Sequence, residues 1–454
     1  MDRIREYCEK ELGLRKETDA FLKELYKLLK SKKTGKQAGF LSLKKETEEL
    51  CRLLKKEGYE TEGKKALIHS LLTEHLKKEA DAVPFETHPL KMISMKEEIE
   101  NQYRLVDIMH RHFNGFEALE EGDYGCHIRY GRPERTVKVE KVLAEYFHAE
   151  AAALVRGGGT GAIRAMCFAS LKHGQRVLIH DAPLYKTTQI TLEAMGIEIR
   201  KTDFNDFRNI EKEIQKGIDV LYIQRVRQKL SDTYDEIRII EKARKIDPKL
   251  LILTDENYAV NKVEKLGAAA GADMSAFSTF KLLGIPGIGL VIGTRKWIDI
   301  VHEQNYSGGG QVQGPEAMET LRSLVENPVL LGVQSLTVDE IEKRLNRKEV
   351  AHVEKAIKAN IEERIILVKL DLPIAREVIE KAIGYGALPH PVGSESRYEV
   401  QALFYRIAKV MIDEDPILSR YVIRINPMRS GPDTVIRILK NSIRDAMKKQ
   451  SKEQ

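Results

Sequence analysis

A lysine and an aspartate each stand at the end of an apolar segment near the middle of the chain. Lys281 follows "MSAFSTF", and Asp255 follows "LLILT". Charged groups beside such segments lose hydration, and that loss is costly unless each group finds a partner. A lysine amine can bond covalently to an aldehyde, and a buried carboxylate can hold a cationic group of a ligand. The pair therefore indicates an active site; a surface lysine beside a strand and an aspartate that caps a helix are the structural alternatives.

A glycine-rich turn and a tyrosine follow two earlier apolar segments. The turn "RGGGTGA" contains Gly158, Gly159, Thr160 and Gly161. Glycines let the backbone aim its amides at a ligand, and a helix that begins there adds its positive end, so the turn predicts a phosphate site. It is neither a Walker sequence nor a dinucleotide-binding GxGxxG. Tyr185, in "IHDAPLYKTT", could stack on a flat heterocycle, although each feature taken alone could equally be structural.

One cofactor requires all of these features together. The phosphate cradle, the aromatic side chain, the carboxylate and the lysine, with Ser278 three residues before the lysine, all follow apolar segments. Pyridoxal 5′-phosphate (PLP) uses each of them, because its aldehyde bonds to a lysine and its ring nitrogen needs an acid. The residues therefore predict PLP as the cofactor.

Seven short apolar segments between residues 152 and 293 alternate with helical patterns. They are "AALV", "RVLIHD", "IEIRKTD", "DVLYIQ", "LLILTDEN", "MSAFST" and "IGLVIG". Buried strands that alternate with helices are typical of an open, mostly parallel sheet covered by helices on both faces. Ligands bind such sheets beyond the carboxyl ends of the strands, which is where the residues above lie. We therefore expect an α/β fold whose large domain contains a seven-stranded, mostly parallel sheet.

The segments on either side of this region predict two further parts. We expect a helical N-terminal extension over residues 1–88, a PLP-binding large α/β domain over 89–330, and a small C-terminal α/β domain over 331–454. Gly58 is expected to stop a helix within the extension, and prolines at 84 and 89 mark its end. The extension is interpreted as a packing or oligomerisation module, with a partner-binding or RNA-binding role as the alternative. Its first helix is expected to place five residues on one face, namely Phe21, Leu22, Leu25, Leu28 and Leu29.

Composition excludes several other classes of protein. At 454 residues, with 42% hydrophobic and 32% charged residues, the chain is typical of a globular protein of more than one domain. No apolar run approaches the roughly 20 residues that span a bilayer, and the N-terminus lacks an apolar signal, so we expect a cytoplasmic protein. The four cysteines have no CxxC spacing and predict no metal site. Residues 1–80 hold 20 Lys/Arg against 15 Asp/Glu, which accounts for most of the net charge of +6 but is too weak to predict nucleic-acid binding.

On these motifs the chain resembles the PLP-dependent enzymes of fold type I. "YGRPERTVKVEKVLAEYFHAEAAALVRGGGTGAI" is similar to the pattern of cystathionine lyases, in which a Tyr-x-Arg pair and a helix precede the glycine turn. Residues from about 89 to 445 resemble the YhfS-like group of aminotransferase class V-fold proteins more closely. The matching stretches are "LVDIMHRHF", "GTGAIRA", "DENYAVNKV", "FSTFK", "YSGGGQVQG", "ALPHPVGSESRYE" and "RINPMRSG".

The resemblance implies a role for each cofactor-binding residue. Lys281 would be the lysine that bonds to PLP, Asp255 would hold the protonated ring nitrogen, and Tyr185 would cover the ring. The amides around Gly159, Thr160 and Gly161, with the Ser278 hydroxyl, would hold the phosphate. Many relatives carry an Asn-Pro contact to the cofactor's 3-hydroxyl after the fourth strand; here Gln224 and Arg227 are the candidates to replace it.

The resemblance also implies an oligomer and a substrate-binding arginine. In the related lyases the Tyr-x-Arg pair reaches the phosphate of a neighbouring subunit, which here implies Tyr130 and Arg132 in a homodimer or homotetramer. Arg424 is the first candidate for the substrate carboxylate and Arg429 is the reserve, because a guanidinium binds a carboxylate with two hydrogen bonds.

The motifs leave the reaction open. Similarity to the class V group favours an aminotransferase acting on an amino acid, and the Tyr-x-Arg segment keeps a β- or γ-lyase as the alternative. A racemase, an enzyme that modifies aminoacyl-tRNA as selenium transferases do, a non-catalytic PLP-binding protein and a scaffold are the remaining hypotheses.

Overall fold

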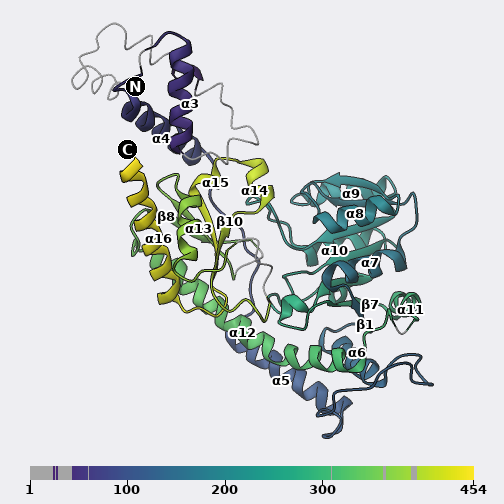
Figure 1. The fold of residues 1–454 in the computed structure, drawn as a ribbon. Helices are drawn as coiled ribbons and strands as arrows, with labels where there is room; N and C mark the ends of the chain where they lie inside the picture. Colours follow the sequence, from purple (N-terminus) through teal and green to yellow (C-terminus); the bar gives the residue numbers. More distant parts are fainter. Residues whose placement is uncertain are drawn as a thin grey trace.

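The computed structural model describes residues 24–25, 27–28, 43–59, 61–307, 309–360, 364–389 and 396–453. Its larger part is built on one sheet, and all seven predicted strands are confirmed (Figure 1). The strands are Ala151–Arg156 (β1), Arg176–His180 (β2), Glu198–Thr202 (β3), Val220–Gln224 (β4), Leu251–Asp255 (β5), Met274–Ser278 (β6) and Ile288–Gly293 (β7).

The order of the strands brings the predicted site residues together. The sheet has the order β1-β7-β6-β5-β4-β2-β3, in which β7 runs antiparallel to β1 and β6 and the other pairs are parallel. The mostly parallel sheet is thus confirmed. Asp255 and Ser278 are the last residues of β5 and β6. Because these strands are parallel neighbours, the two residues lie at the same edge of the sheet.

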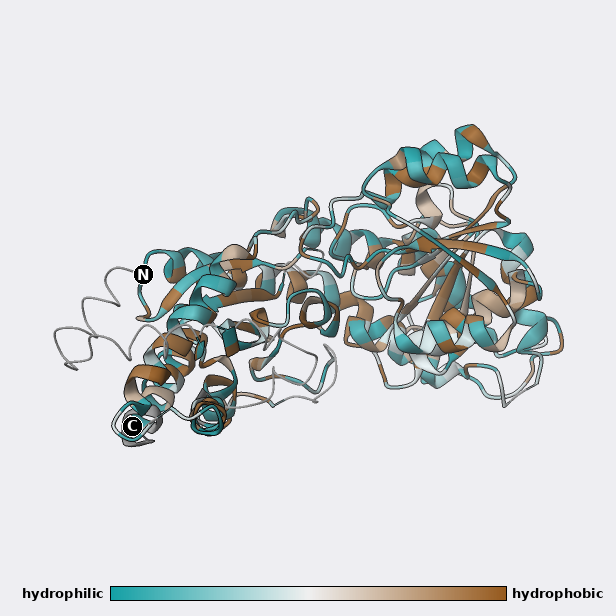
Figure 2. Cartoon of the chain, turned by 90° about the horizontal axis from the view of Figure 1, so that it is seen from above, coloured by the Kyte–Doolittle hydropathy of each residue, from teal (hydrophilic) through white to brown (hydrophobic). Residues whose placement is uncertain are grey.

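Helices cover both faces of the sheet, as the alternating pattern predicts. Figure 2 shows hydrophobic strands between helices whose outer sides are hydrophilic. One face is covered by α7 (Gly158–Ser170), α8 (Lys186–Ala194) and α11 (Arg295–Gln304). The other is covered by α5 (Met95–His112), α6 (Glu134–Tyr146), α9 (Phe207–Gln215), α10 (Glu236–Ile246) and part of α12.

A single long helix joins the two parts of the molecule. The helix α12 (Gly314–Asn346) runs beneath both domains and packs along α5 (Figure 1). The boundary expected at residue 330 falls inside this helix. Pro328, in the interior of the helix, lies near that point and removes one backbone hydrogen bond without ending the helix.

The small domain contains a second, four-stranded antiparallel sheet of order β10-β11-β9-β8. The segments "RIILVKL" and "YVIRIN" contain β9 (Ile366–Leu370) and β11 (Val422–Asn426), whereas β8 (Val353–Lys358) and β10 (Leu403–Arg406) carry no clear sequence pattern. The C-terminal half of α12, α13 (Ala375–Ile383) and α16 (Pro432–Glu453) cover one face. Two short helices, α14 (Lys409–Glu414) and α15 (Leu418–Tyr421), lie between β10 and β11.

The N-terminal extension covers the other face of this small sheet. Its helices α3 (Leu43–Lys56) and α4 (Lys65–Ala82) share one buried apolar cluster with residues of β8, β9 and β10. Gly58 follows α3 with a φ of 85°, which confirms it as the helix stop. Leu25 is fully buried and Leu28 packs on the same cluster, whereas Phe21, Leu22 and Leu29 lie outside the described residues. None of the described helices has the length and hydropathy that a membrane crossing requires.

Candidate active site

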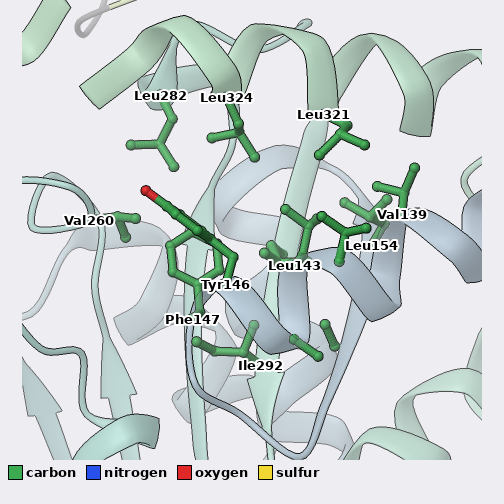
Figure 3. Close-up of a cluster of buried hydrophobic side chains, with 14 of the residues drawn as sticks. Val139, Leu143, Tyr146, Phe147, Leu154, Val260, Leu282, Ile292, Leu321 and Leu324 are labelled. Carbon is green, nitrogen blue, oxygen red and sulfur yellow. The ribbon is translucent and has the colours of Figure 1, made fainter. Parts of the chain in front are cut away.

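Lys281 stands in a short 3-10 turn, η3 (Phe280–Leu282), that directly follows β6. The amides of Leu282 and Gly284 both donate to the carbonyl of Thr279, each at 2.9 Å, and these bonds close the turn. Leu282 is buried in the core of the large domain, beside Leu324 and Tyr146 (Figure 3). Because Leu282 anchors the turn in the core, the preceding lysine is held at the edge of the sheet, where it is half-buried.

Two tyrosines flank the Lys281 amine. Its nitrogen lies 3.7 Å from the centre of the Tyr258 ring and 5.8 Å from the centre of the Tyr185 ring. Tyr185 is 55% exposed and precedes α8, so it presents a ring face at the mouth of the site. Sequence reasoning missed Tyr258, although an aromatic residue three places after Asp255 was a visible signal.

Asp255 ends β5 as a buried carboxylate, with 4% of its surface exposed. Burial raises the pKa of Asp255, while two hydrogen bonds from Asn257 and the Lys281 charge act to lower it. Both bonds, from the backbone amide at 3.0 Å and the side-chain nitrogen at 2.7 Å, fall on Oδ1. Among the described residues Oδ2 receives no such bond, so it can accept one from a cationic ligand group that would also relieve the cost of burial.

Asn257 links three parts of the site, and sequence reasoning did not single it out. Besides holding Asp255, its side-chain oxygen accepts a hydrogen bond from the Ser278 amide at 3.1 Å. A Cβ placed on Gly159 would lie only 2.6 Å from that oxygen, so a residue larger than glycine would displace Asn257. The glycine turn, the acid and the end of β6 therefore meet at one amide side chain.

The glycine turn forms the N-terminus of α7 opposite Ser278. Gly157 and Gly158 have φ angles of 95° and 60°, a conformation that glycine adopts without strain. The Gly158 amide donates to the Gly287 carbonyl and the Gly161 amide to the Gly157 carbonyl, each at 2.9 Å. Two of the expected phosphate donors are therefore engaged by the backbone.

Two amides at this helix start remain as donors for an anion. Gly159 and Thr160 precede the first amide that bonds within α7, so their N–H groups have no intrahelical acceptor. The Ser278 hydroxyl faces the turn, 3.7 Å from where a Cβ on Gly158 would lie. Two backbone donors, a hydroxyl and a helix N-terminus are groups that could hold a phosphate.

These residues fit PLP. The Gly159 and Thr160 amides with the Ser278 hydroxyl would hold the phosphate, and Asp255 Oδ2 would accept a hydrogen bond from the ring nitrogen. Lys281 follows β6 at the same sheet edge, and the exposed Tyr185 ring would lie over the cofactor. The geometry thus brings together the four groups that the sequence placed at the strand ends.

Both candidates for the 3-hydroxyl contact have hydrogen-bond partners within the chain. The side-chain oxygen of Gln224 accepts a hydrogen bond from the Tyr185 amide at 3.0 Å, so Gln224 helps to position this tyrosine. The Arg227 guanidinium is buried and donates to the carbonyls of Asp232 and His88. Arg227 therefore joins the large domain to the segment that leads out of the extension.

The two arginine candidates lie in the small domain. The Arg424 guanidinium stacks on the ring of Tyr405, 4.0 Å from its centre, on the strand β11. Arg429 donates to the carbonyls of Ser396 and Glu399, each at 3.2 Å. The loop that Arg429 holds also carries Tyr398, whose ring centre lies 6.2 Å from that of Phe280, the residue before the lysine.

Tyr130 and Arg132 lie at the open β1 edge of the sheet, where they line a cavity of about 260 Å³. Arg132 donates from Nε to the buried carboxylate of Glu140 at 3.1 Å. Burial raises the pKa of Glu140 to about 7, although the Arg132 charge lowers it. The cavity is lined by neither Lys281 nor Asp255. Within one chain, therefore, the Tyr-x-Arg pair does not share a cavity with the lysine site.

The fold and the site together define a PLP-dependent enzyme of fold type I. Residues 103–325 match the family model of Cys/Met metabolism PLP-dependent enzymes, and residues 339–439 match that of the YhfS-like C-terminal domain. The chain is 43% identical over 359 residues to the protein YhfS of Escherichia coli K12, with 79% of this chain and 99% of that protein covered. It belongs to the YhfS family of PLP-dependent proteins.

Solved structures agree with this assignment. The crystal structure of the pyridoxal-5′-phosphate-dependent protein YhfS from Escherichia coli is 42% identical and matches with a TM-score of 0.77, covering 80% of this chain and 100% of that chain. A putative cystathionine β-lyase involved in aluminium resistance from Listeria monocytogenes has a TM-score of 0.59 at 18% identity, covering 77% of this chain and 95% of that one. A methionine γ-lyase from Micromonospora echinospora has a TM-score of 0.59 at 16% identity, covering 75% and 98%. These two likenesses concern the fold alone.

Proposed function

We propose that this protein is a PLP-dependent lyase that breaks a carbon–sulfur bond at the β or γ position of an amino acid. The observation that carries the proposal is the match of residues 103–325 to the Cys/Met metabolism family, since that range contains the glycine turn, Asp255 and Lys281. The lyases of similar fold point the same way. The aminotransferase that the sequence first favoured becomes the second hypothesis, supported by the resemblance to the class V group.

Each residue of the site would have one task in this reaction. When bound, PLP draws electrons away from the carbon that carries the substrate's amino group. Lys281 would remove the proton from that carbon, because its amine stands at the sheet edge beside Asp255. Asp255 would keep the ring nitrogen protonated, and Asn257 would hold Asp255 in place. The pair of electrons in the carbon–sulfur bond would leave with sulfur, which takes up a proton to give a thiol; water would then release a 2-keto acid and ammonia.

Residues outside this cluster would complete the site. Arg424, with Arg429 in reserve, would bind the substrate carboxylate through two hydrogen bonds. Tyr130 and Arg132 would reach the phosphate of a neighbouring copy in a homo-oligomer. A row of large apolar side chains on the same segment supports such an interface, because exposed apolar patches mark contact surfaces. These residues are 75% to 100% exposed: Phe116, Leu119, Tyr124 and Ile128.

The test is to mix the purified holoprotein with cystathionine, cysteine, methionine and alanine, and to measure 2-keto acid, ammonia and the released sulfur product. A lyase gives keto acid and ammonia in equal amounts with a thiol from cystathionine or methionine, or with hydrogen sulfide from cysteine, and gives none of these products from alanine. Keto acid without ammonia, accompanied by amination of the cofactor, would replace the proposal with transamination. A cofactor spectrum that responds to no amine would indicate a PLP-binding protein without catalysis.

Lys281→Ala is the matched control for every substrate. The wild-type protein should be yellow, and borohydride should fix the cofactor on the peptide that contains Lys281. The variant should lose the covalent label and turnover while keeping its fold. An unchanged colour and an unchanged label in this variant would remove Lys281 from its role.

A further inference from the structure

Two lysines, one of them without an assigned role, lie near the same tyrosine ring. The Lys281 nitrogen is 3.7 Å from the centre of the Tyr258 ring, and the Lys262 nitrogen is 5.7 Å from the same centre. Both distances fall within the roughly 6 Å over which a cation is attracted to the face of an aromatic ring. Tyr258 is therefore close enough to interact with both amines.

Lys262 is buried near a pair of charged side chains. Only 2% of its surface is exposed. Glu98 and Arg364, both fully buried, form an ion pair at 2.6 Å, and the Lys262 charge acts on Glu98 as well. Burial nevertheless raises the pKa of Glu98 to about 8. Lys262 therefore places a second positive charge near the Tyr258 ring that Lys281 also approaches.

Tyr258 has a strained backbone conformation. Its φ of 68° is unusual for an aromatic residue and strains the chain, and Asn261 nearby has a φ of 56°. Asn261 is tied to the core by hydrogen bonds with Tyr146 at 3.2 Å and Asn327 at 2.8 Å. The Lys262 amide also donates to the Ala259 carbonyl at 2.9 Å. A strained conformation that the surrounding core maintains is typical of a functional position.

We propose that Tyr258 is a positioning residue that receives the ammonium group of Lys281 whenever this amine is not bonded to the cofactor, and that Lys262 opposes protonation of the amine there. This inference rests on the assignment of Lys281 as the lysine that bonds to PLP. A lysine that acts as a base must be able to lose its proton near neutral pH. The ring face attracts the ammonium form of Lys281, which raises the pKa of its amine. The positive charge of Lys262 repels the ammonium form, which lowers that pKa.

Other charged and titratable groups also face Lys281. Asp255 on β5 favours the ammonium form, and Tyr185 presents a second ring at 5.8 Å before α8. Glu98 on α5 and Arg364 before β9 act on the site through Lys262. Substitutions at Tyr258 and Lys262 leave all four of these groups in place, so the effects of the two residues can be measured separately.

The experiment measures the protonation of Lys281 directly. The full-length protein is freed of PLP with hydroxylamine, labelled briefly with trace acetic anhydride between pH 6 and 11, and analysed by mass spectrometry of the Lys281 peptide. Tyr258→Leu should lower the pH midpoint of acetylation by roughly 0.5 to 1 unit, the effect of losing a cation–ring contact, whereas Tyr258→Phe keeps the ring and the midpoint. Lys262→Met should raise the midpoint by roughly half a unit or more, because a neighbouring like charge disappears.

Controls separate the outcomes. Lys265→Met removes an exposed lysine three residues away and should leave the midpoint unchanged. Equal midpoints for the leucine and phenylalanine variants would overturn the role of the ring. Lys262→Met retains the tyrosine, so a midpoint that stays or falls in this variant would overturn the inference even if Tyr258→Leu does not fold. Borohydride labelling of a different lysine in the wild-type holoprotein would instead refute the proposed function.

Discussion

The side-chain oxygen of Asn257 accepts a hydrogen bond from the Ser278 amide at 3.1 Å. This one contact fastens the end of β5 to the end of β6, while the other end of the same amide holds Asp255 at 2.7 Å. Asp255, the proposed partner of the ring nitrogen, and Ser278, proposed to hold the phosphate, are thus set at a fixed separation before any cofactor binds. Because these side chains are already held in place, less conformational entropy is lost when the cofactor binds.

Replacing Asn257 by alanine should weaken cofactor binding. The change removes two side-chain hydrogen bonds in a half-buried position, and each such loss costs about 1 kcal/mol or more. We expect the dissociation constant for PLP, measured by absorbance titration of stripped protein, to rise roughly tenfold or more. Asn346→Ala is the matched control, because Asn346 bonds to the Ala356 backbone in the small domain. Equal PLP affinities of the two variants would contradict the assigned role.

Replacing Asp255 by asparagine should separate cofactor binding from turnover. The asparagine oxygen can still accept both hydrogen bonds from Asn257, and Lys281 remains, so the variant should contain PLP. Without a negative charge the ring nitrogen is not held protonated, and we expect turnover to fall by about 100-fold or more, as for other lost electrostatic contacts. The measurement is PLP content by absorbance alongside steady-state product formation. Full PLP content with turnover near that of the wild type would show that the acid is not Asp255.

The buried carboxyl of Glu140 should make stability depend on pH. Burial raises the pKa of Glu140 to about 7 in the folded protein from its ordinary value of 4.5, so the folded state binds a proton more tightly than the unfolded state. The resulting stabilisation is complete below about pH 4.5 and is lost as the pH rises to about 7. We therefore expect the free energy of unfolding of the wild type to fall relative to that of Glu140→Gln across this window.

Denaturant unfolding at several pH values between 4.5 and 8.5 measures this difference. Glu264→Gln, at an exposed position, is the control and should follow the wild type at every pH. A constant difference between wild type and Glu140→Gln over the whole range would mean that Glu140 has the same proton affinity in the folded and unfolded states.

The N-terminal extension should be needed for the stability of the small domain. Helices α3 and α4 bury an apolar cluster against the small sheet that includes Leu367, Leu403 and Tyr405. A protein that starts at Met92 would expose that face, and we expect a lower melting temperature and aggregation, observed by calorimetry and light scattering. Equal stability and solubility of the truncated and full-length proteins would leave the extension without a structural role.

A point substitution tests the same interface without removing the extension. Leu71, with 4% of its surface exposed, belongs to the shared cluster. Leu71→Ala should cost about 2–5 kcal/mol of stability, because it leaves a cavity in a packed core. Ser70→Ala, at the exposed neighbouring position, should change stability little.

The sequence alone determined the elements of the large domain and the residues that the site would use. Strands such as "LILTD" and "MSAFS" are rich in apolar residues because both faces of the sheet are covered, and that pattern is local. The positions of Asp255 and Lys281 after such strands placed them at one sheet edge, because parallel strands end on the same side. The local pattern of apolar residues and a general rule of sheet topology were sufficient to predict the strands and the positions of these two residues.

Tertiary structure alone decided what joins these residues. The pairing of Asn257 with Ser278 and the contacts of Tyr258 with two lysines depend on which strands become neighbours and on a left-handed backbone turn. The short strands β8 and β10 are recognisable only through their partners in the small sheet. Contacts between residues distant in sequence depend on the packing of the whole chain, so they cannot be predicted from a local sequence pattern.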